Sequence, residues 1–183
     1  MSFYQDMIWP SLKVTLLIIA AAFVNVSYAE ETDQQLLAKG MWHDPKTNLI
    51  WTRCLLGEQW TGSSCVGDKI KYTWHGAIEV AKLTKYAEHT DWRVPRIDEL
   101  YAVKVKSESD KRSMILPSPL CKPDNSSSFY LWSSSTNTGW KATAYFIKYM
   151  TDEYAIPNIC YLMYTDYSDK SNKYYVRLVR SSK

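Results

Sequence analysis

The sequence predicts a mixed fold class in which short strands combine with two helices, and two observations carry that prediction. The segment Asp91–Leu100 reads DWRVPRIDEL, with the apolar Trp92 and Val94 alternating with charged residues ahead of Pro95. Proline disfavours the helical conformation in the residue before it and is tolerated in the first turn of a helix, so an extended segment should turn here into a helix. The second observation is an even number of cysteines, four in all, which indicates a chain held by disulfides.

Short runs of aromatic and β-branched residues between turn residues predict the strands. In chain order these runs are residues 41–43, 49–52, 129–134, 142–149 and 174–180. Helices are expected from residue 74 to about 88, with Thr73 as the cap of the first turn, and from residue 97 to about 106. Residues 44–48 and 136–139 have the composition of turns, and residues 31–39 form a polar lead-in. Residues 107–128 and 150–173 are predicted to be long irregular loops, a class of segment that is often functional.

Residues 1–29 have the pattern of a secretory signal peptide. Lys13 precedes an apolar run over residues 14–26, and residues 27–29 offer small side chains at the positions that a signal peptidase reads. The alternative is an uncleaved membrane anchor, but the run is well short of the roughly 20 residues that span a bilayer. We therefore expect a secreted or periplasmic protein, with residues 30–183 as a single domain and no membrane insertion after cleavage.

The composition is rich in aromatic residues and nearly balanced in charge. The chain has eight Trp and fourteen Tyr, and its formal net charge is +3. So small a positive charge, in an exported protein, argues against a nucleic-acid partner. Tyrosines beside Ser and Asn give contact area at low entropic cost and suit a binding surface, although aromatic core packing explains the same residues equally well.

The four cysteines are expected to form two disulfides, because an exported chain meets an oxidising compartment. Four cysteines allow three pairings, of which we favour Cys54–Cys65 and Cys121–Cys160. The first would close a short loop and the second would join two long irregular segments, each stabilising the fold by about 3–4 kcal/mol. No free thiol would then remain as a nucleophile or a metal ligand.

Six segments of the chain match the motifs of one family, in order and at plausible spacing. They are Asp44, Thr47, Leu49 and Trp51, with Asn48 in place of a glycine; Arg53, Cys54, Gly57, Trp60, Gly62 and Cys65; Thr73, Trp74 and Ala77; Asp91, Trp92, Arg93, Pro95, Glu99 and Leu100; Trp132, Ser133 and Ser134; and Val176, Arg177, Val179 and Arg180. On these residues the chain resembles the Lcl C-terminal domain family, a bacterial domain of largely unknown function named after a collagen-like adhesin. The resemblance covers residues 41–180.

The resemblance implies a C-type-lectin-like α+β fold, with two helices, short antiparallel sheets and long loops, in which the first and last strands pair. We expect the motif residues to be structural: Trp51, Trp74, Trp92, Arg93, Pro95, Glu99, Trp132 and Arg177. Glu99 should be partly buried and bonded to Arg93 or Arg177, because it and the adjacent Asp98 point in different directions on a helix and cannot work as an acid–base pair. Arg96 stands where the family has Thr or Asn, so the second helix should lack a side-chain cap.

Two groups of side chains are the candidates for ligand binding. Tyr154, Tyr161, Tyr164 and Tyr167 lie in the second long loop, where they could stack on a sugar, grip a protein or pack partly in the core. Lys104, Lys106, Lys111 and Arg112, with Lys122, could form a basic patch for a sulfated polysaccharide, the ligand class associated with the namesake adhesin family. A solvated loop explains these basic residues equally well.

Catalysis, metal ions and cofactors find little support in the sequence. His43, His75 and His89 share no metal-ligand spacing. Lys122-Pro123-Asp124 and Ile156-Pro157-Asn158 each lack the first calcium ligand of the lectin triplets that they resemble. The sequence contains neither a Gly-rich phosphate loop nor a nucleophile elbow. We therefore expect no cofactor, no metal site and no enzymatic activity.

These observations predict an exported binding or adhesion module that acts through its long loops. Its ligand would be a glycan, such as a sulfated polysaccharide, or another exported protein. The alternative is a structural or accessory subunit of a cell-surface assembly such as a pilus. An exposed tyrosine surface would favour the first hypothesis, and a large dry apolar patch would favour the second.

Overall fold

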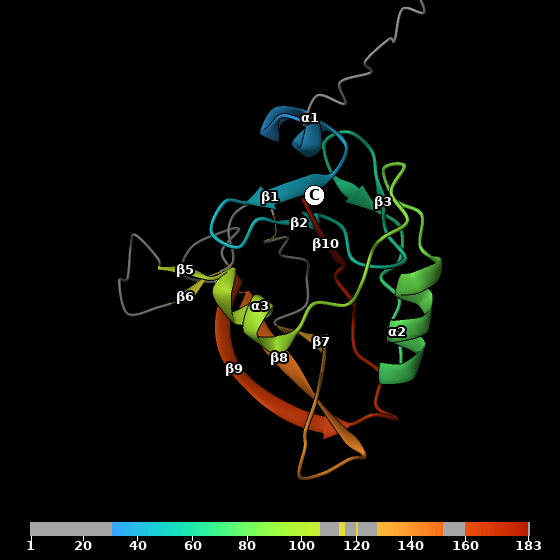
Figure 1. The fold of residues 1–183 in the computed structure, drawn as a ribbon, viewed down its shortest axis with the longest axis vertical. Helices are drawn as coiled ribbons and strands as arrows, with labels where there is room; N and C mark the ends of the chain where they lie inside the picture. Colours follow the sequence, from blue (N-terminus) through green and yellow to red (C-terminus); the bar gives the residue numbers. More distant parts are fainter. Residues whose placement is uncertain (1–30, 107–113, 116–119, 121–127, 152–159, 183) are drawn as a thin grey trace, which may run out of the picture. The chain divides into compact units, whose positions relative to one another are not determined.

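Helices and antiparallel sheets together make up the domain, in a computed structural model that describes residues 31–106, 114–115, 120, 128–151 and 160–182 (Figure 1). Within these residues there are three helices and three sheets, of three, two and five strands. The predicted α+β class is therefore confirmed. The predicted signal peptide, residues 1–29, lies outside the described residues.

The first sheet has the strand order β1-β2-β10. β1 (Met41–Asp44) and β2 (Leu49–Thr52) pair antiparallel across the predicted turn, in which Asn48 has a φ of 56°. β10 (Val179–Ser181) pairs with the other edge of β2. The first and last strands therefore do not pair with each other, contrary to what the resemblance implied. All four residues of β2 are buried, so β2 is the central strand and lies between them.

The largest sheet has the order β5-β6-β9-β8-β7, and its three long strands, β7, β8 and β9, extend to the lower end of the domain in Figure 1. Its strands are β5 (Val105–Lys106), β6 (Met114–Ile115), β7 (Ser128–Thr136), β8 (Thr143–Thr151) and β9 (Cys160–Asp169). The hairpin of β7 and β8 around the predicted turn is as expected. Residues 107–128 and 150–173 were predicted to be irregular loops. This prediction is wrong for β6, which lies in the first segment, and for β9, which lies in the second. β9 pairs with β8 from Thr143↔Asp169 to Thr151↔Cys160, and such pairing with a distant strand leaves no local pattern in a segment rich in Tyr, Asp and Ser.

The first helix, α1 (Asp33–Ala38), lies where the sequence suggested only a polar lead-in. Thr32 and Gln35 form a reciprocal capping box, in which each side chain accepts a hydrogen bond from the other residue's backbone N–H. Leu36 is buried and fixes the helix to the domain.

The second helix, α2 (Trp74–Leu83), begins at the predicted cap, where the Thr73 side chain accepts a hydrogen bond from the N–H of Gly76. It ends well before the predicted residue 88. A tight turn follows, in which Ala87 and Glu88 adopt φ values of 47° and 70° that no helix contains. The third helix, α3 (Ile97–Ala102), also ends early, because residues 105–106 form β5.

The predicted last strand, residues 174–180, is regular only in β10. Ahead of it, Tyr174 and Tyr175 form isolated bridges with Tyr72 and Leu131. The small ribbon of β3 (Gln59–Trp60) and β4 (Cys65–Val66) carries the Cys54–Cys65 disulfide, whose Cα atoms are 5.5 Å apart.

The core consists of two apolar clusters on opposite sides of the largest sheet. Alternate residues of β8 enter different clusters: Ile147 and Tyr149 pack with Leu100 of α3, whereas Ala144 and Phe146 pack with other residues that include Trp132. This alternation determines which side chains of β8 and β9 share a face of the sheet.

Candidate functional site

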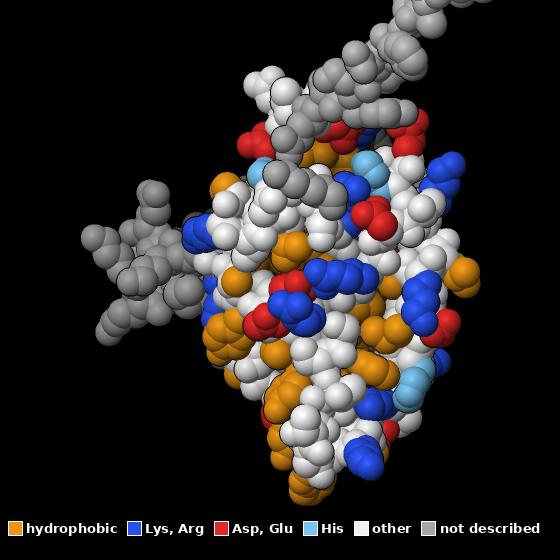
Figure 2. Space-filling model, in the orientation of Figure 1, with side chains coloured by type: hydrophobic (Ala, Val, Ile, Leu, Met, Phe, Trp, Pro, Cys, Tyr) orange, Lys and Arg blue, Asp and Glu red, His pale blue; other side chains and the backbone are white. Residues whose placement is uncertain are grey.

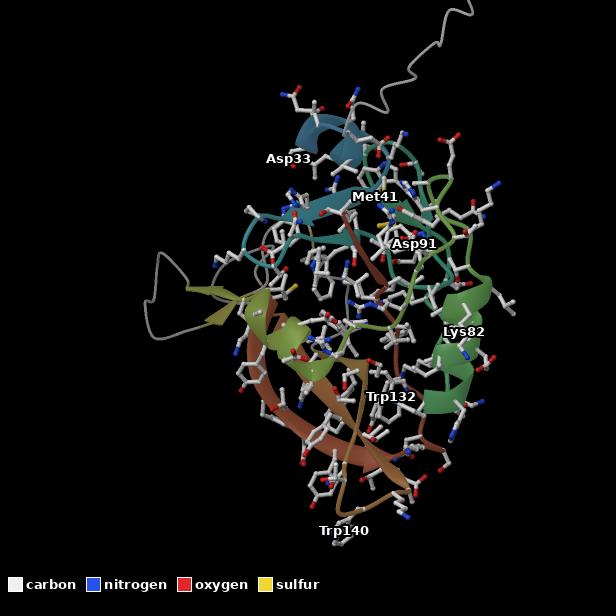
Figure 3. All side chains as sticks on the ribbon, viewed as in Figure 1. Asp33, Met41, Lys82, Asp91, Trp132 and Trp140 are labelled. Atoms are coloured by element: carbon white, nitrogen blue, oxygen red, sulfur yellow. A yellow bond between two sulfur atoms is a disulfide. The ribbon has the colours of Figure 1, made fainter. Side chains whose placement is uncertain are left out.

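Exposed aromatic side chains gather at the free end of the largest sheet. Trp140, in the turn between β7 and β8, lies at the extreme of this end (Figure 3) and exposes 64% of its surface. Tyr167 of β9 exposes 43%. Apolar side chains are visible on the surface from the region of α3 down to this end of the sheet (Figure 2). Isolated exposed aromatic residues need no explanation, but a group at one end of a sheet indicates a surface with a role.

The two exposed rings and the half-buried ring of Tyr145 form a continuous group, which we call the aromatic platform: Trp140, Tyr145 and Tyr167. Tyr145 and Tyr167 are cross-strand partners, with ring centroids 6.4 Å apart. The Trp140 ring lies 6.1 Å from the Tyr167 ring. The interplanar angles, 87° and 47°, show that the three rings are not coplanar. The platform is therefore a twisted surface rather than a flat one.

The turn that carries Trp140 is held by backbone and side-chain hydrogen bonds. The carbonyl of Trp140 accepts bonds from both the N–H and the hydroxyl of Thr143, at 2.8 Å each. Lys170 donates from its ammonium to the carbonyl of Lys141 at 2.7 Å and from its N–H to the carbonyl of Ala142 at 2.9 Å. A ring displayed on a fixed turn loses little conformational entropy when it binds a ligand.

The rest of this face is covered by α3 and the residue that follows it. Leu100 and Val103 are buried in the same cluster as Ile147 and Tyr149, which follow Tyr145 on the same face of β8. Among the described elements, α3 contacts β7 and β8 in the upper part of their hairpin, and the turn between the two strands extends below it (Figure 1).

The predicted ligand-binding tyrosines do not form one surface. Tyr164 and Tyr167 are three residues apart on β9, so their side chains point to opposite faces of the sheet. Tyr164 pairs across the strands with Lys148, and Tyr167 pairs with Tyr145. Tyr161 lies in β9, but its side chain is outside the described residues, as is the whole of Tyr154.

The predicted basic patch is only partly described, and Lys104 does not fit it. Lys104 is 9% exposed, and its ammonium lies 3.1 Å from the centroid of the Tyr101 ring. Burial lowers the pKa of Lys104. It is therefore a packed cation under an aromatic ring rather than a member of a solvated cluster. The side chain of Lys106, and the whole of Lys111, Arg112 and Lys122, lie outside the described residues.

The motif turn is held by an ion pair between Arg93 and Glu99. Both terminal guanidinium nitrogens of Arg93 donate to the Glu99 carboxylate at 2.7 Å, and the N–H of Arg96 donates to it at 2.8 Å. Burial alone would raise the pKa of Glu99, but these hydrogen bonds outweigh it and the pKa lies below its usual value. Arg96 provides no side-chain cap, as expected, and the N–H of Ile97 instead donates to the hydroxyl of Ser135 at 3.1 Å.

Arg177, the other expected partner of Glu99, instead holds three backbone carbonyls. Its buried guanidinium donates to the carbonyls of Thr52, Arg53 and Leu120 at 2.6, 2.7 and 2.9 Å. Burial lowers its pKa to about 10. Arg177 thus ties the end of β2 to a segment far along the chain, which is a structural role.

The motif tryptophans also make structural contacts. Trp51 and Trp132 are fully buried, and Trp92 is 2% exposed. Trp74, the fourth motif tryptophan, donates from its indole N–H to the carbonyl of Ser133 at 2.9 Å. The carbonyl of Pro95 accepts a hydrogen bond from the N–H of Ser134 at 2.7 Å, which joins the motif turn to β7.

The cysteines are structural where they are described. The predicted Cys54–Cys65 disulfide is confirmed. Cys160 is buried and disulfide-bonded, and its predicted partner, Cys121, lies outside the described residues. Cys54, Glu58 and Cys65 bring their ligand atoms within 4.8 Å of one another, but sulfurs joined in a disulfide are not thiolates and do not bind metal as such.

Comparison with known proteins gives one finding. Residues 40–180 match the Lcl C-terminal domain. The chain belongs to the Lcl C-terminal domain family. No curated protein and no solved structure gave a significant match. The C-type-lectin-like description of the Lcl C-terminal domain fold therefore stays a prediction for this chain.

The matched range of this Lcl C-terminal domain includes both the buried motif residues and the aromatic platform. None of the helices within the described residues is long and apolar enough to cross a membrane. Sequence reasoning missed Trp140 and Tyr145 as site residues. The sequence shows the alternation of Tyr145, Ile147 and Tyr149 on β8. It does not show that strand pairing brings Tyr167 beside Tyr145.

Proposed function

We propose that this chain is an exported saccharide-binding module and that the aromatic platform is its binding site. The observation that carries the proposal is the grouping of Trp140, Tyr145 and Tyr167 at the free end of the largest sheet. Tryptophan and tyrosine offer a rigid apolar ring face together with a polar handle, which suits the C–H faces and hydroxyls of a sugar.

The geometry favours a single, soluble saccharide chain over a crystalline surface. Three coplanar rings would match a flat array of sugars, whereas these rings are turned by 47° and 87° relative to one another. The ring centroids are 6.1 and 6.4 Å apart, so neighbouring rings can contact successive or overlapping parts of one chain.

Export is part of the proposal and rests on two observations. The first 29 residues have a signal-peptide pattern, and the Cys54–Cys65 disulfide suits an oxidising compartment. The rival proposal, a structural or accessory subunit of a surface assembly, would place the platform against a protein partner instead of a glycan.

The experiment is an array of neutral and sulfated glycans probed with the purified protein, with calcium or a chelator. The proposal expects binding to defined sugars that Trp140→Ala weakens and that the chelator leaves intact. Unchanged glycan binding by Trp140→Ala would contradict the proposal that the aromatic platform is the binding site. If no glycan on the array binds, the proposal of a subunit in a surface assembly is favoured. Crosslinking to exported proteins would then test that proposal.

A further inference from the structure

The face of the sheet opposite the platform carries a row of three residues from three adjacent strands. Tyr130 of β7 pairs with Lys148 of β8, and Lys148 pairs with Tyr164 of β9. Directly paired residues point to the same face, so a lysine stands between two tyrosines. The ammonium of Lys148 lies 5.4 Å from the centroid of the Tyr130 ring and 5.6 Å from that of Tyr164.

The positive charge of Lys148 has no acidic partner among the described residues. The nearest candidate in register is Asp166, which belongs to the next row, opposite Phe146. Its carboxylate accepts the N–H of Tyr167 at 2.8 Å and makes no ion pair with Lys148. Two aromatic faces therefore flank the ammonium where a structural lysine would have a carboxylate.

The surroundings leave this row accessible on one side. The Tyr130 ring stacks on Tyr174, with centroids 5.2 Å apart and an interplanar angle of 22°, and Tyr174 covers it. Tyr164 meets Phe146 edge-on at 6.3 Å and exposes 44% of its surface. Tyr130 is thus held by Tyr174, while Tyr164 is exposed and Lys148 is half-buried between the two rings.

We infer that Tyr130, Lys148 and Tyr164 form a second saccharide subsite, which takes the carboxylate of an acidic sugar unit. A lone ammonium is a compact point charge that can pair with the single carboxylate of an acidic sugar unit, without the fork geometry that bidentate recognition needs. A flanking ring gives a pyranose a face to stack on, which the side chain of an acidic peptide would not use. The inference extends the proposed function, but it depends on different residues from those of the platform.

The test is isothermal titration of the purified protein with tetragalacturonate and with its methyl ester, at low salt. The two probes share the same sugar chain and differ only at the carboxyl groups, which are ionised in the acid and methylated and uncharged in the ester. We expect the acid to bind at least about tenfold more tightly than the ester, a preference worth about 1.4 kcal/mol, and we expect this preference to decline as salt is added.

Lys148→Met should abolish the preference while keeping the length of the side chain. Lys46→Met, in the turn between β1 and β2, is the matched control and should retain the preference. Tyr164→Ala should weaken the binding of both probes. Equal affinity for acid and ester, binding of neither, or a preference that survives in Lys148→Met would overturn the inference. Trp140→Ala separates the two sites, because it should impair neutral glycans and leave the acid-over-ester preference in place.

Discussion

Arg93 and Glu99 form a two-bonded ion pair that closes the turn between the extended motif segment and α3. The two terminal guanidinium nitrogens each donate to a different carboxylate oxygen at 2.7 Å, and the Glu99 side chain is only 8% exposed. Arg93 also exchanges two backbone hydrogen bonds with Val179, both 2.9 Å long. The pair therefore connects α3 to the last strand.

Glu99→Ala should lower the free energy of unfolding by about 2 kcal/mol, because it leaves Arg93 and the N–H of Arg96 without their acceptor. Urea unfolding measures this. Asp98→Ala is the matched control, since Asp98 is 64% exposed and its ion-pair partner Arg96 is exposed too; its effect should stay within about 0.5 kcal/mol. Equal effects of the two substitutions would contradict the structural role of Glu99.

The contribution of Glu99 should also depend on pH. Its pKa in the folded protein lies below the usual value of 4.5. A carboxyl group with a lowered folded pKa stabilises the protein above the unfolded pKa, and this stabilisation is lost as the pH falls towards the folded pKa. The difference in unfolding free energy between wild type and Glu99→Gln should therefore be full at pH 7 and shrink below pH 4.5. A constant difference across this range would show that ionisation of Glu99 is not involved.

Replacing Cys54 and Cys65 together by Ala should lower the free energy of unfolding by about 3 kcal/mol, as expected for a loop of this length. The two cysteines are 11 residues apart. Thermal unfolding of the double variant, compared with wild type without reductant, measures the effect. An unchanged melting temperature would mean that the disulfide adds nothing to the stability of the folded domain.

Residues that tolerate a left-handed backbone should stabilise the turn between Tyr86 and His89. Ala87 and Glu88 have φ values of 47° and 70°, and the residues on either side exchange two hydrogen bonds at 3.0 Å. Ala87→Asn with Glu88→Gly should raise the free energy of unfolding by about 1 kcal/mol.

The matched control for this turn is Glu79→Gly, at an exposed position of α2. The same kind of change should there destabilise by about 1 kcal/mol, because glycine is a poor helix residue. If the turn variant and Glu79→Gly lowered the free energy of unfolding equally, the left-handed conformation assigned to Glu88 would be contradicted.

Local chemistry made the motif turn, α2 and the β7–β8 hairpin predictable from sequence. Pro95 limits the conformation before it, and Thr73 offers a hydroxyl where a helix needs an acceptor. The Cys54–Cys65 pairing was favoured because it closes a short loop, and the structural role of the motif residues was implied by the family resemblance.

Pairing between distant strands made β9 and both faces of the candidate site unpredictable. Tyr161, Tyr164 and Tyr167 recur every third residue, a spacing that does not indicate a strand, and only the register against β8 separates Tyr164 from Tyr167. The same register places Lys148 between two tyrosines. The helix α1 was not predicted, although Thr32 and Gln35 have the spacing of a capping box. The helix is so short that its apolar residues give no clear periodic pattern.

The most direct measurement of the central claim is isothermal titration of the best glycan from the array into the wild type, Trp140→Ala, Tyr167→Ala and Tyr101→Ala. Tyr101 is an exposed tyrosine on α3, 46% accessible against 43% for Tyr167, and serves as the matched control. The account predicts about tenfold weaker binding, about 1.4 kcal/mol, for each platform variant at unchanged melting temperature, and wild-type affinity for Tyr101→Ala. Wild-type affinity in both platform variants would contradict it.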